Sequence, residues 1–117
     1  MGLVTNYSVE EDEVRRYLRM INVDGYIKAV VTGLQARKKP SPEGIIKCSE
    51  LLGVSPNRCV VVGDTVADIR AGKSAGCYTA AVLTGVGDYD TLSREGPDFC
   101  VRDLKELVEE LKRSGLL

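Results

Sequence analysis

The sequence predicts an α/β fold, a three-layer α/β/α sandwich around a mostly parallel sheet. Short β-branched and apolar runs alternate with helical patterns along the chain, which is typical of this class. The run "RCVVV" is apolar without a break, as expected for a parallel strand covered on both faces. With 117 residues, 44% of them hydrophobic and 28% charged, the chain is expected to form one domain, residues 1–117, around one core.

The first half of the chain has signals for two strands and two helices. Behind an acidic first turn, apolar residues recur at helical spacing. In "KKPSPEG", Pro40 keeps Lys39 extended, and Ser41 can cap a helix whose first residue is Pro42 and which stops at Gly53. In order, the expected elements are a strand at 2–5, a helix at 9–21, a strand at 26–32 and a helix at 42–52.

The second half continues the alternation. The apolar run "RCVVV" is followed by a helical segment, and a further β-rich run precedes the only long loop, "TGVGDYDTLSREGP". The expected elements are strands at 58–62, 77–83 and 99–101 and helices at 66–75 and 104–111. Ligands of such sheets bind beyond the carboxyl ends of the strands, where this chain gathers small and polar residues.

Composition excludes several function classes. The formal net charge is -1 and no basic cluster exceeds "ARKK", which argues against binding to nucleic acid or an anionic membrane. No apolar run is long enough to span a membrane, and the first residues lack the features of a signal peptide, so we expect a cytoplasmic protein. The chain has no histidine, which removes histidine-based catalysis, and its four cysteines form no CxxC pair and are expected to fill the core.

Two acids stand at the end of the third predicted strand, in "GDTVAD". Gly63 permits a sharp turn, Asp64 lies at the strand exit, and Asp68 follows one helical turn later on the same face. Both carboxylates can approach one Mg²⁺, which binds proteins through one or two carboxylates and retains water or phosphate oxygens. The structural alternative is that Asp64 or Thr65 caps the helix and Asp68 is solvated.

Two further positions carry candidate chemistry. Lys39, held extended before Pro40, places an ammonium that suits a phosphoryl oxygen or a carboxylate pair. Thr5 ends the first strand, where its hydroxyl and the next main-chain N–H can donate to an anion. The structural alternatives are a solvated surface lysine and a simple strand-end cap.

Taken in order, "GLVTN", "KKPSPEG" and "VVVGDTVADIRAG" resemble motifs II, III and IV of the haloacid dehalogenase superfamily of phosphohydrolases. The segments "AVVTG", "SAGCYTAAVLTG" and "DFCVRDLKELVEEL" resemble its phosphoglycolate-phosphatase-like branch. The resemblance implies hydrolysis of a small phosphorylated metabolite with Mg²⁺. It assigns phosphate binding to Thr5, Asn6 and Lys39, direct Mg²⁺ ligation to Asp64, and an indirect or orienting role to Asp68, with Thr5 and Lys39 as the catalytic pair.

The first motif of that superfamily, DxDxT, has no match, and neither does the helical cap between motifs I and II. DxDxT supplies the aspartate nucleophile from a central strand, so we expect this chain to be inactive alone and to need a nucleophile from outside itself. The strands bearing motifs II and IV would then flank a gap. We expect that gap to be closed either by direct pairing of those strands or by another chain, a homo-oligomer or a complementing polypeptide.

Other readings are weaker. "ADIRAGKS" loosely fits a phosphate-loop pattern but falls inside a predicted helix, and a phosphoacceptor receiver domain carries its lysine after its aspartate, the reverse of the order here. The serious alternative to a phosphatase core or subunit is a non-catalytic scaffold of the same fold that serves binding or assembly.

Overall fold

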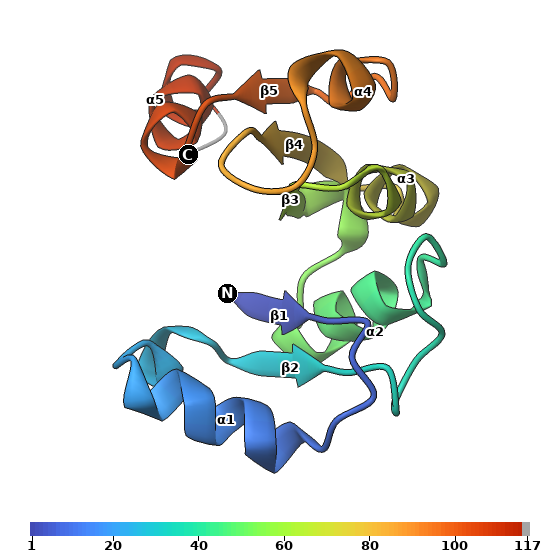
Figure 1. Ribbon diagram of the computed structural model, residues 1–117, viewed down its shortest axis with the longest axis vertical. Coiled ribbons are helices and arrows are strands. Elements are labelled where there is room, and N and C mark those ends of the chain that lie inside the picture. The colour runs from blue at the N-terminus through green and yellow to red at the C-terminus, as the bar shows by residue number, and fades with distance from the viewer. Residues whose placement is uncertain (116–117) are drawn as a thin grey trace.

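The computed structural model describes residues 1–115, and its elements alternate between strand and helix as the sequence predicts (Figure 1). The elements are β1 (Gly2–Val4), α1 (Glu11–Met20), η1 (Asp24–Tyr26), β2 (Ala29–Val31), α2 (Glu43–Leu52), η2 (Pro56–Arg58), β3 (Val60–Gly63), α3 (Val66–Ala75), β4 (Tyr78–Val82), α4 (Tyr89–Ser93), β5 (Phe99–Val101) and α5 (Leu104–Arg113). The two η segments are single turns of 3-10 helix.

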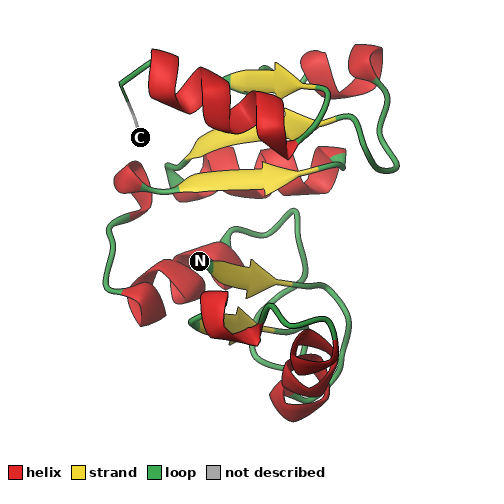
Figure 2. Cartoon of the chain, turned by 90° about the vertical axis from the view of Figure 1, so that its left-hand side faces the viewer, coloured by secondary structure: helices red, strands yellow, loops and turns green. Residues whose placement is uncertain are grey.

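The strands form two parallel sheets. One has the order β1-β2 and the other the order β3-β4-β5, with Leu3 opposite Val30 in the first and Val61 opposite Thr79 in the second. In the view of Figure 2 the arrows of all five strands point to the same side, and β1 and β3 face each other across the division between the sheets, while Figure 1 shows that the two sheets are turned relative to each other. The α/β class with parallel strands is therefore confirmed.

One of the two expected ways to close the gap was direct pairing of β1 with β3. That expectation is wrong. β1 and β3 make no ladder with each other. Val4 and Val61 instead pack against Ile45 and Ala71 of the neighbouring helices. In addition, the Lys39 ammonium donates a hydrogen bond to the Val4 carbonyl, with 3.2 Å between Nζ and O. This carbonyl at the β1 edge therefore has a partner other than a strand. Closure by another chain stays a prediction.

The helices join the two sheets on one side. α2 packs on β1 and β2, α3 packs on β3 and β4, and the two helices contact each other. We call the cluster of Val4, Ile45, Val61 and Ala71 between them the seam. On the remaining strands α1 contacts β2, and α5 contacts β4 and β5. The seam thus holds the two sheets together without any strand pairing between them.

All four cysteines are free thiols, and the expectation that they fill the core is met by two of them. Cys48 and Cys77 are buried, and Cys59 and Cys100 are half-buried. Burial raises the pKa of the Cys48, Cys77 and Cys100 thiols. Within residues 1–115, no helix combines the length and apolar character that crossing a bilayer demands.

Some predicted boundaries are wrong. The second strand begins at Ala29 rather than residue 26, because Arg15 donates to the carbonyls of Ile27 and Lys28 and a 3-10 turn precedes them. α2 begins one residue after Pro42. The segment expected to be a loop, 84–97, contains α4, which Asp88 caps by accepting from the Thr91 N–H.

Candidate functional site

A slot opens between the facing edges of β1 and β3. It is a cavity of about 430 Å³, lined mainly by apolar side chains of both strands and of α2, and Leu104 of α5 also reaches it. Two charged residues line it, Lys39 and Asp68. Both lie near the carboxyl ends of the strands. Asp68 is in the first turn of α3, which follows β3, and Lys39 contacts Val4, the last residue of β1. The slot therefore runs along the unpaired strand edges and ends at an ion pair.

Lys39 and Asp68 form the central contact of the site. The Lys39 Nζ lies 2.6 Å from Asp68 Oδ1, and the two side chains are 16% and 12% exposed. The same ammonium donates to the Val4 carbonyl. The alternative that Lys39 is a solvated surface lysine is wrong. A charge-assisted bond with so little water around it is stronger than an exposed pair and fixes the position of the ammonium.

Asp68 is also fixed by the start of α3. Its Oδ2 accepts from the main-chain N–H groups of Asp64 and Thr65 at 3.2 and 3.3 Å, and its own N–H donates to Thr65 Oγ1 at 3.2 Å. This is a capping box, in which the first and fourth residues satisfy each other's N–H groups. Gly63 makes room for it, since a Cβ there would lie 2.5 Å from Asp68 Oδ2. Thr65 is thus the helix cap of the structural alternative, while the expectation of a solvated Asp68 is wrong.

Asp64 is held by a different segment. Its Oδ2 accepts from the Val86 N–H at 3.0 Å, and its carbonyl accepts from the Gly87 N–H at 2.9 Å. None of the hydrogen bonds described for residues 1–115 uses Asp64 Oδ1. Asp64 therefore offers one carboxylate oxygen at the rim, whereas Asp68 has committed both of its oxygens to Lys39 and to the helix start.

The donor set limits how a cation could bind. Within the described residues no three acids, cysteines or histidines are grouped as a metal-binding cluster. Mg²⁺ needs only one or two protein carboxylates when water and phosphate complete its shell, so Asp64 fits as a single direct ligand. The sequence suggested that both acids could approach one cation. The geometry instead leaves Asp68 an orienting position, because its carboxylate is bound to Lys39.

Thr5 and Asn6 follow β1 at the same rim. The Thr5 hydroxyl oxygen accepts from the Tyr7 N–H at 3.2 Å, as in the cap alternative, which leaves the hydroxyl proton for another acceptor. The Asn6 side chain forms two hydrogen bonds with the main chain of Lys39. Its Oδ1 accepts from the Lys39 N–H at 2.7 Å, and its Nδ2 donates to the Lys39 carbonyl at 3.3 Å. Asn6 thus holds Lys39 in place, and its main-chain N–H and the second N–H of its Nδ2 remain as donors for an anion.

Sequence reasoning missed two features of this site. The bond between Asn6 and Lys39 spans 33 residues, and no periodic pattern links such positions. The contact of Val86 with Asp64 spans 22 residues. Here a signal existed, because "TGVG" places two glycines directly after a strand, and such glycines often mark a close approach of backbone to another group.

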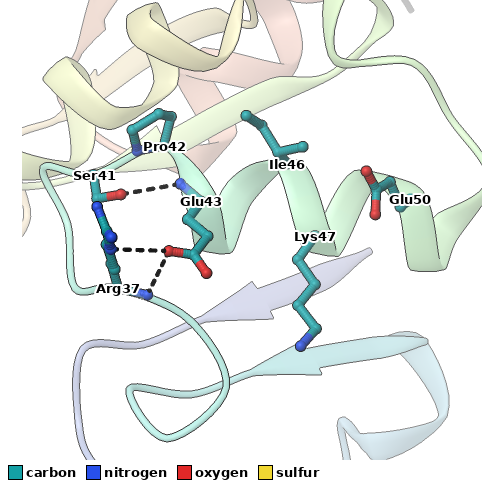
Figure 3. Close-up of a pocket in the computed structure, with 7 residues that line it drawn as sticks. All are labelled: Arg37, Ser41, Pro42, Glu43, Ile46, Lys47 and Glu50. Atoms are coloured by element: carbon teal, nitrogen blue, oxygen red, sulfur yellow. Dashed lines mark hydrogen bonds and ion pairs between the residues drawn. The ribbon is translucent and has the colours of Figure 1, made fainter.

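A second, open depression of about 480 Å³ lies on the outer side of α2 (Figure 3). Several of its polar groups are engaged: Glu43 Oε2 accepts from the Arg37 N–H at 3.2 Å, and the Glu43 N–H donates to the Ser41 hydroxyl at 3.3 Å. Lys47, on the same helix, donates to the Gln35 carbonyl. These contacts fasten the start of α2, so we assign the chemistry to the slot.

Known protein families and proteins include relatives of this chain. The sequence pattern of the family described as HAD-hydrolase-like matches residues 36–107, which include Lys39, Asp64 and Asp68. A phosphoglycolate phosphatase of Aquifex aeolicus is 40% identical over 85% of this chain and 46% of its own length. The pyrophosphatase PpaX of Bacillus velezensis is 31% identical over 92% of this chain and 50% of its own.

A solved structure also shares the fold. A HAD family hydrolase from Deinococcus radiodurans, with bound phosphate and sodium, aligns with a TM-score of 0.81 and 26% identity over 99% of this chain and 53% of that one. The chain spans about half the length of the curated relatives it matches.

Proposed function

The chain belongs to the HAD-hydrolase-like family, and from that premise we propose that it is part of the core of a phosphatase that hydrolyses a small phosphomonoester with Mg²⁺. In this proposal the nucleophilic aspartate comes from polypeptide outside these 117 residues. The phosphatases among the relatives support the reaction class. The observation that carries the proposal is the slot between β1 and β3. Lys39 and Asp68 form its end at the carboxyl termini of these strands.

The slot has the form of a missing parallel strand. It is bordered by β1 and β3, which point toward the same side in Figure 2, and its walls include Leu3, Val60 and Val62. A strand inserted parallel to both would end at the same edge of the sheet as its neighbours. A carboxylate at its end would therefore arrive beside the Lys39 ammonium. Such a strand would also satisfy main-chain groups that otherwise lack a partner in the ladder.

The residues at the rim suit phosphoryl transfer. The inserted aspartate would attack phosphorus, the bond to the leaving oxygen would break, and water would then cleave the acyl phosphate and regenerate the carboxylate. Lys39 would offset charge on the phosphoryl oxygens, and Thr5 would donate its hydroxyl proton to one of them. Asp64 would hold Mg²⁺, which when bound supplies charge neutralisation at the phosphoryl group. Asp68 and the Asn6 side chain would keep Lys39 in place.

Complementation tests the proposal. The purified chain with Mg²⁺ should hydrolyse p-nitrophenyl phosphate and small phosphomonoesters no faster than background. A second polypeptide that carries an apolar strand ending in DxDxT, followed by a helical cap, should restore turnover in trans. Lys39→Ala or Asp64→Asn should abolish the restored activity, and Lys38→Ala, on the exposed neighbour of Lys39, should leave it unchanged.

Two results would contradict the proposal in different ways. Robust turnover by the pure chain, lost in Asp64→Asn, would place the nucleophile within these residues. Failure of every complementing polypeptide, despite a folded chain, would favour the non-catalytic scaffold.

A further inference from the structure

The loop after β4 wraps around Asp64. We call residues 84–88 the clamp loop. Within it the Val86 N–H donates to Asp64 Oδ2 at 3.0 Å, and the Gly87 N–H donates to the Asp64 carbonyl at 2.9 Å. Consecutive N–H groups therefore bind the side chain and the main chain of one residue, which lies more than twenty positions earlier. Both bonds restrict where the Asp64 carboxylate can point.

The clamp loop needs glycine because it lies so close to Asp64. A Cβ at Gly85 would be 1.8 Å from Asp64 Oδ2, and a Cβ at Gly87 would be 2.6 Å from the Asp64 carbonyl and 2.8 Å from the Leu92 side chain. Neither glycine has a positive φ, so close approach, and not backbone conformation, excludes a side chain.

The far end of the loop is fixed as well. Asp88 caps α4 by accepting from the Thr91 N–H at 2.8 Å, and this hydrogen bond lowers the pKa of Asp88. Leu92 of α4 is fully buried and packs with Ile69 and Ala81. The clamp loop is therefore held by a packed helix on one side and by β4 on the other.

From these contacts we propose that the clamp loop positions the Asp64 carboxylate for Mg²⁺, with the Val86 N–H as the positioning donor and Gly85 as the residue that permits it. The proposal rests on the proposed function, in which Asp64 is the direct ligand. A hydrogen bond to Oδ2 leaves Oδ1 for the cation and fixes the carboxylate before the cation arrives. Loss of such an outer hydrogen bond typically weakens metal binding by about 10- to 100-fold.

Proline at position 86 tests the donor directly. Val86 is 87% exposed, so replacing its side chain disturbs few contacts, and proline removes the N–H that donates to Asp64 Oδ2. Val86→Ala is the matched reference because it keeps that N–H. Mg²⁺ is titrated into each 117-residue chain up to about 100 mM and followed by the amide shifts of Asp64 and Thr65, since wild-type affinity is expected near the millimolar range. We expect Val86→Pro to bind Mg²⁺ about 10- to 100-fold more weakly than Val86→Ala.

A glycine pair gives an independent measurement. Gly85→Ala must displace Asp64 Oδ2 and should weaken Mg²⁺ binding to a similar extent, whereas a Cβ at Gly25 would meet nothing within 4 Å and Gly25→Ala should bind as wild type does. Amide shifts of β3 and α3 away from the loop report whether each variant keeps the fold, which separates positioning from unfolding.

The outcomes distinguish the two proposals. Equal Mg²⁺ affinity in Val86→Pro and Val86→Ala, or in Gly85→Ala and Gly25→Ala, would overturn the positioning role while leaving Asp64 as a ligand. If the wild-type chain shows no response to Mg²⁺ at Asp64 or Thr65, the assignment of Asp64 fails, and the positioning role fails with it.

Discussion

Lys39→Met should destabilise the chain strongly, because it leaves the Asp68 carboxylate buried without its cation. Nζ and Oδ1 are 2.6 Å apart, and the carboxylate side chain is only 12% exposed. Removing one partner of a buried pair costs about 3–5 kcal/mol. Asp68 keeps its bonds from the Asp64 and Thr65 N–H groups and some contact with water, so we expect a loss of about 2–3 kcal/mol in the free energy of unfolding.

A double-mutant cycle isolates the contribution of the pair. Urea unfolding of wild type, Lys39→Met, Asp68→Asn and the double variant should show a coupling energy of about 1–2 kcal/mol, because the double variant leaves no unpaired charge. Lys38→Met is the control for the loss of a positive charge, since its side chain is exposed beside Lys39. A coupling energy near zero, or a Lys38→Met variant as unstable as Lys39→Met, would refute the reasoning.

Three further predictions concern stability, each measured by urea unfolding. Asp98→Ala should cost about 1–3 kcal/mol, because the N–H of the fully buried Thr79 donates to Asp98 Oδ2 at 2.8 Å and would lose its acceptor; no change would mean that water replaces it. Asp103→Ala should cost about 1 kcal/mol by removing the cap of α5, and an unchanged midpoint would contradict that assignment. Burial raises the pKa of Cys48, so the folded state holds a proton that the unfolded chain releases as pH rises past about 8.5. Stability should therefore fall above that pH, and less so in Cys48→Ala; an equal fall in both proteins would exclude this thiol as the cause.

The site positions predictable from the sequence are those fixed by strand order. Asp64 follows a strand that is apolar throughout, and Thr5 follows the strand "GLV". Because β1 and β3 run toward the same side of the molecule, both residues lie at the carboxyl ends of their strands on that side, although the two strands do not pair. Lys39 was predictable from its place before Pro40 and at the entry of a helix. Its partner was not, because the sequence has no signal for which nearby acid an ammonium reaches across 29 residues.

The site features that escaped prediction depend on tertiary contacts. Whether Asp68 is solvated or buried depends on Lys39, and the role of Asn6 depends on the path of the chain 33 residues later. α4 was missed because five helical residues carry too little periodicity within a stretch of turn-forming residues. The gap between β1 and β3 was predicted from the absence of DxDxT. That the two strands do not pair could not be predicted, because it depends on how the seam and Lys39 hold them.

The seam has a consequence for how the chain unfolds. The β1-β2 sheet and the β3-β4-β5 sheet are joined by the seam and by the Lys39–Asp68 pair, and not by a strand ladder, so no continuous ladder forces the two sheets to open together. We therefore expect amide hydrogens of β1 and β2 to exchange with solvent through local openings that leave β3 to β5 protected. A strand inserted in the slot would couple the two sheets into one cooperative unit, so that binding of the nucleophile-bearing segment and completion of the fold would be one event.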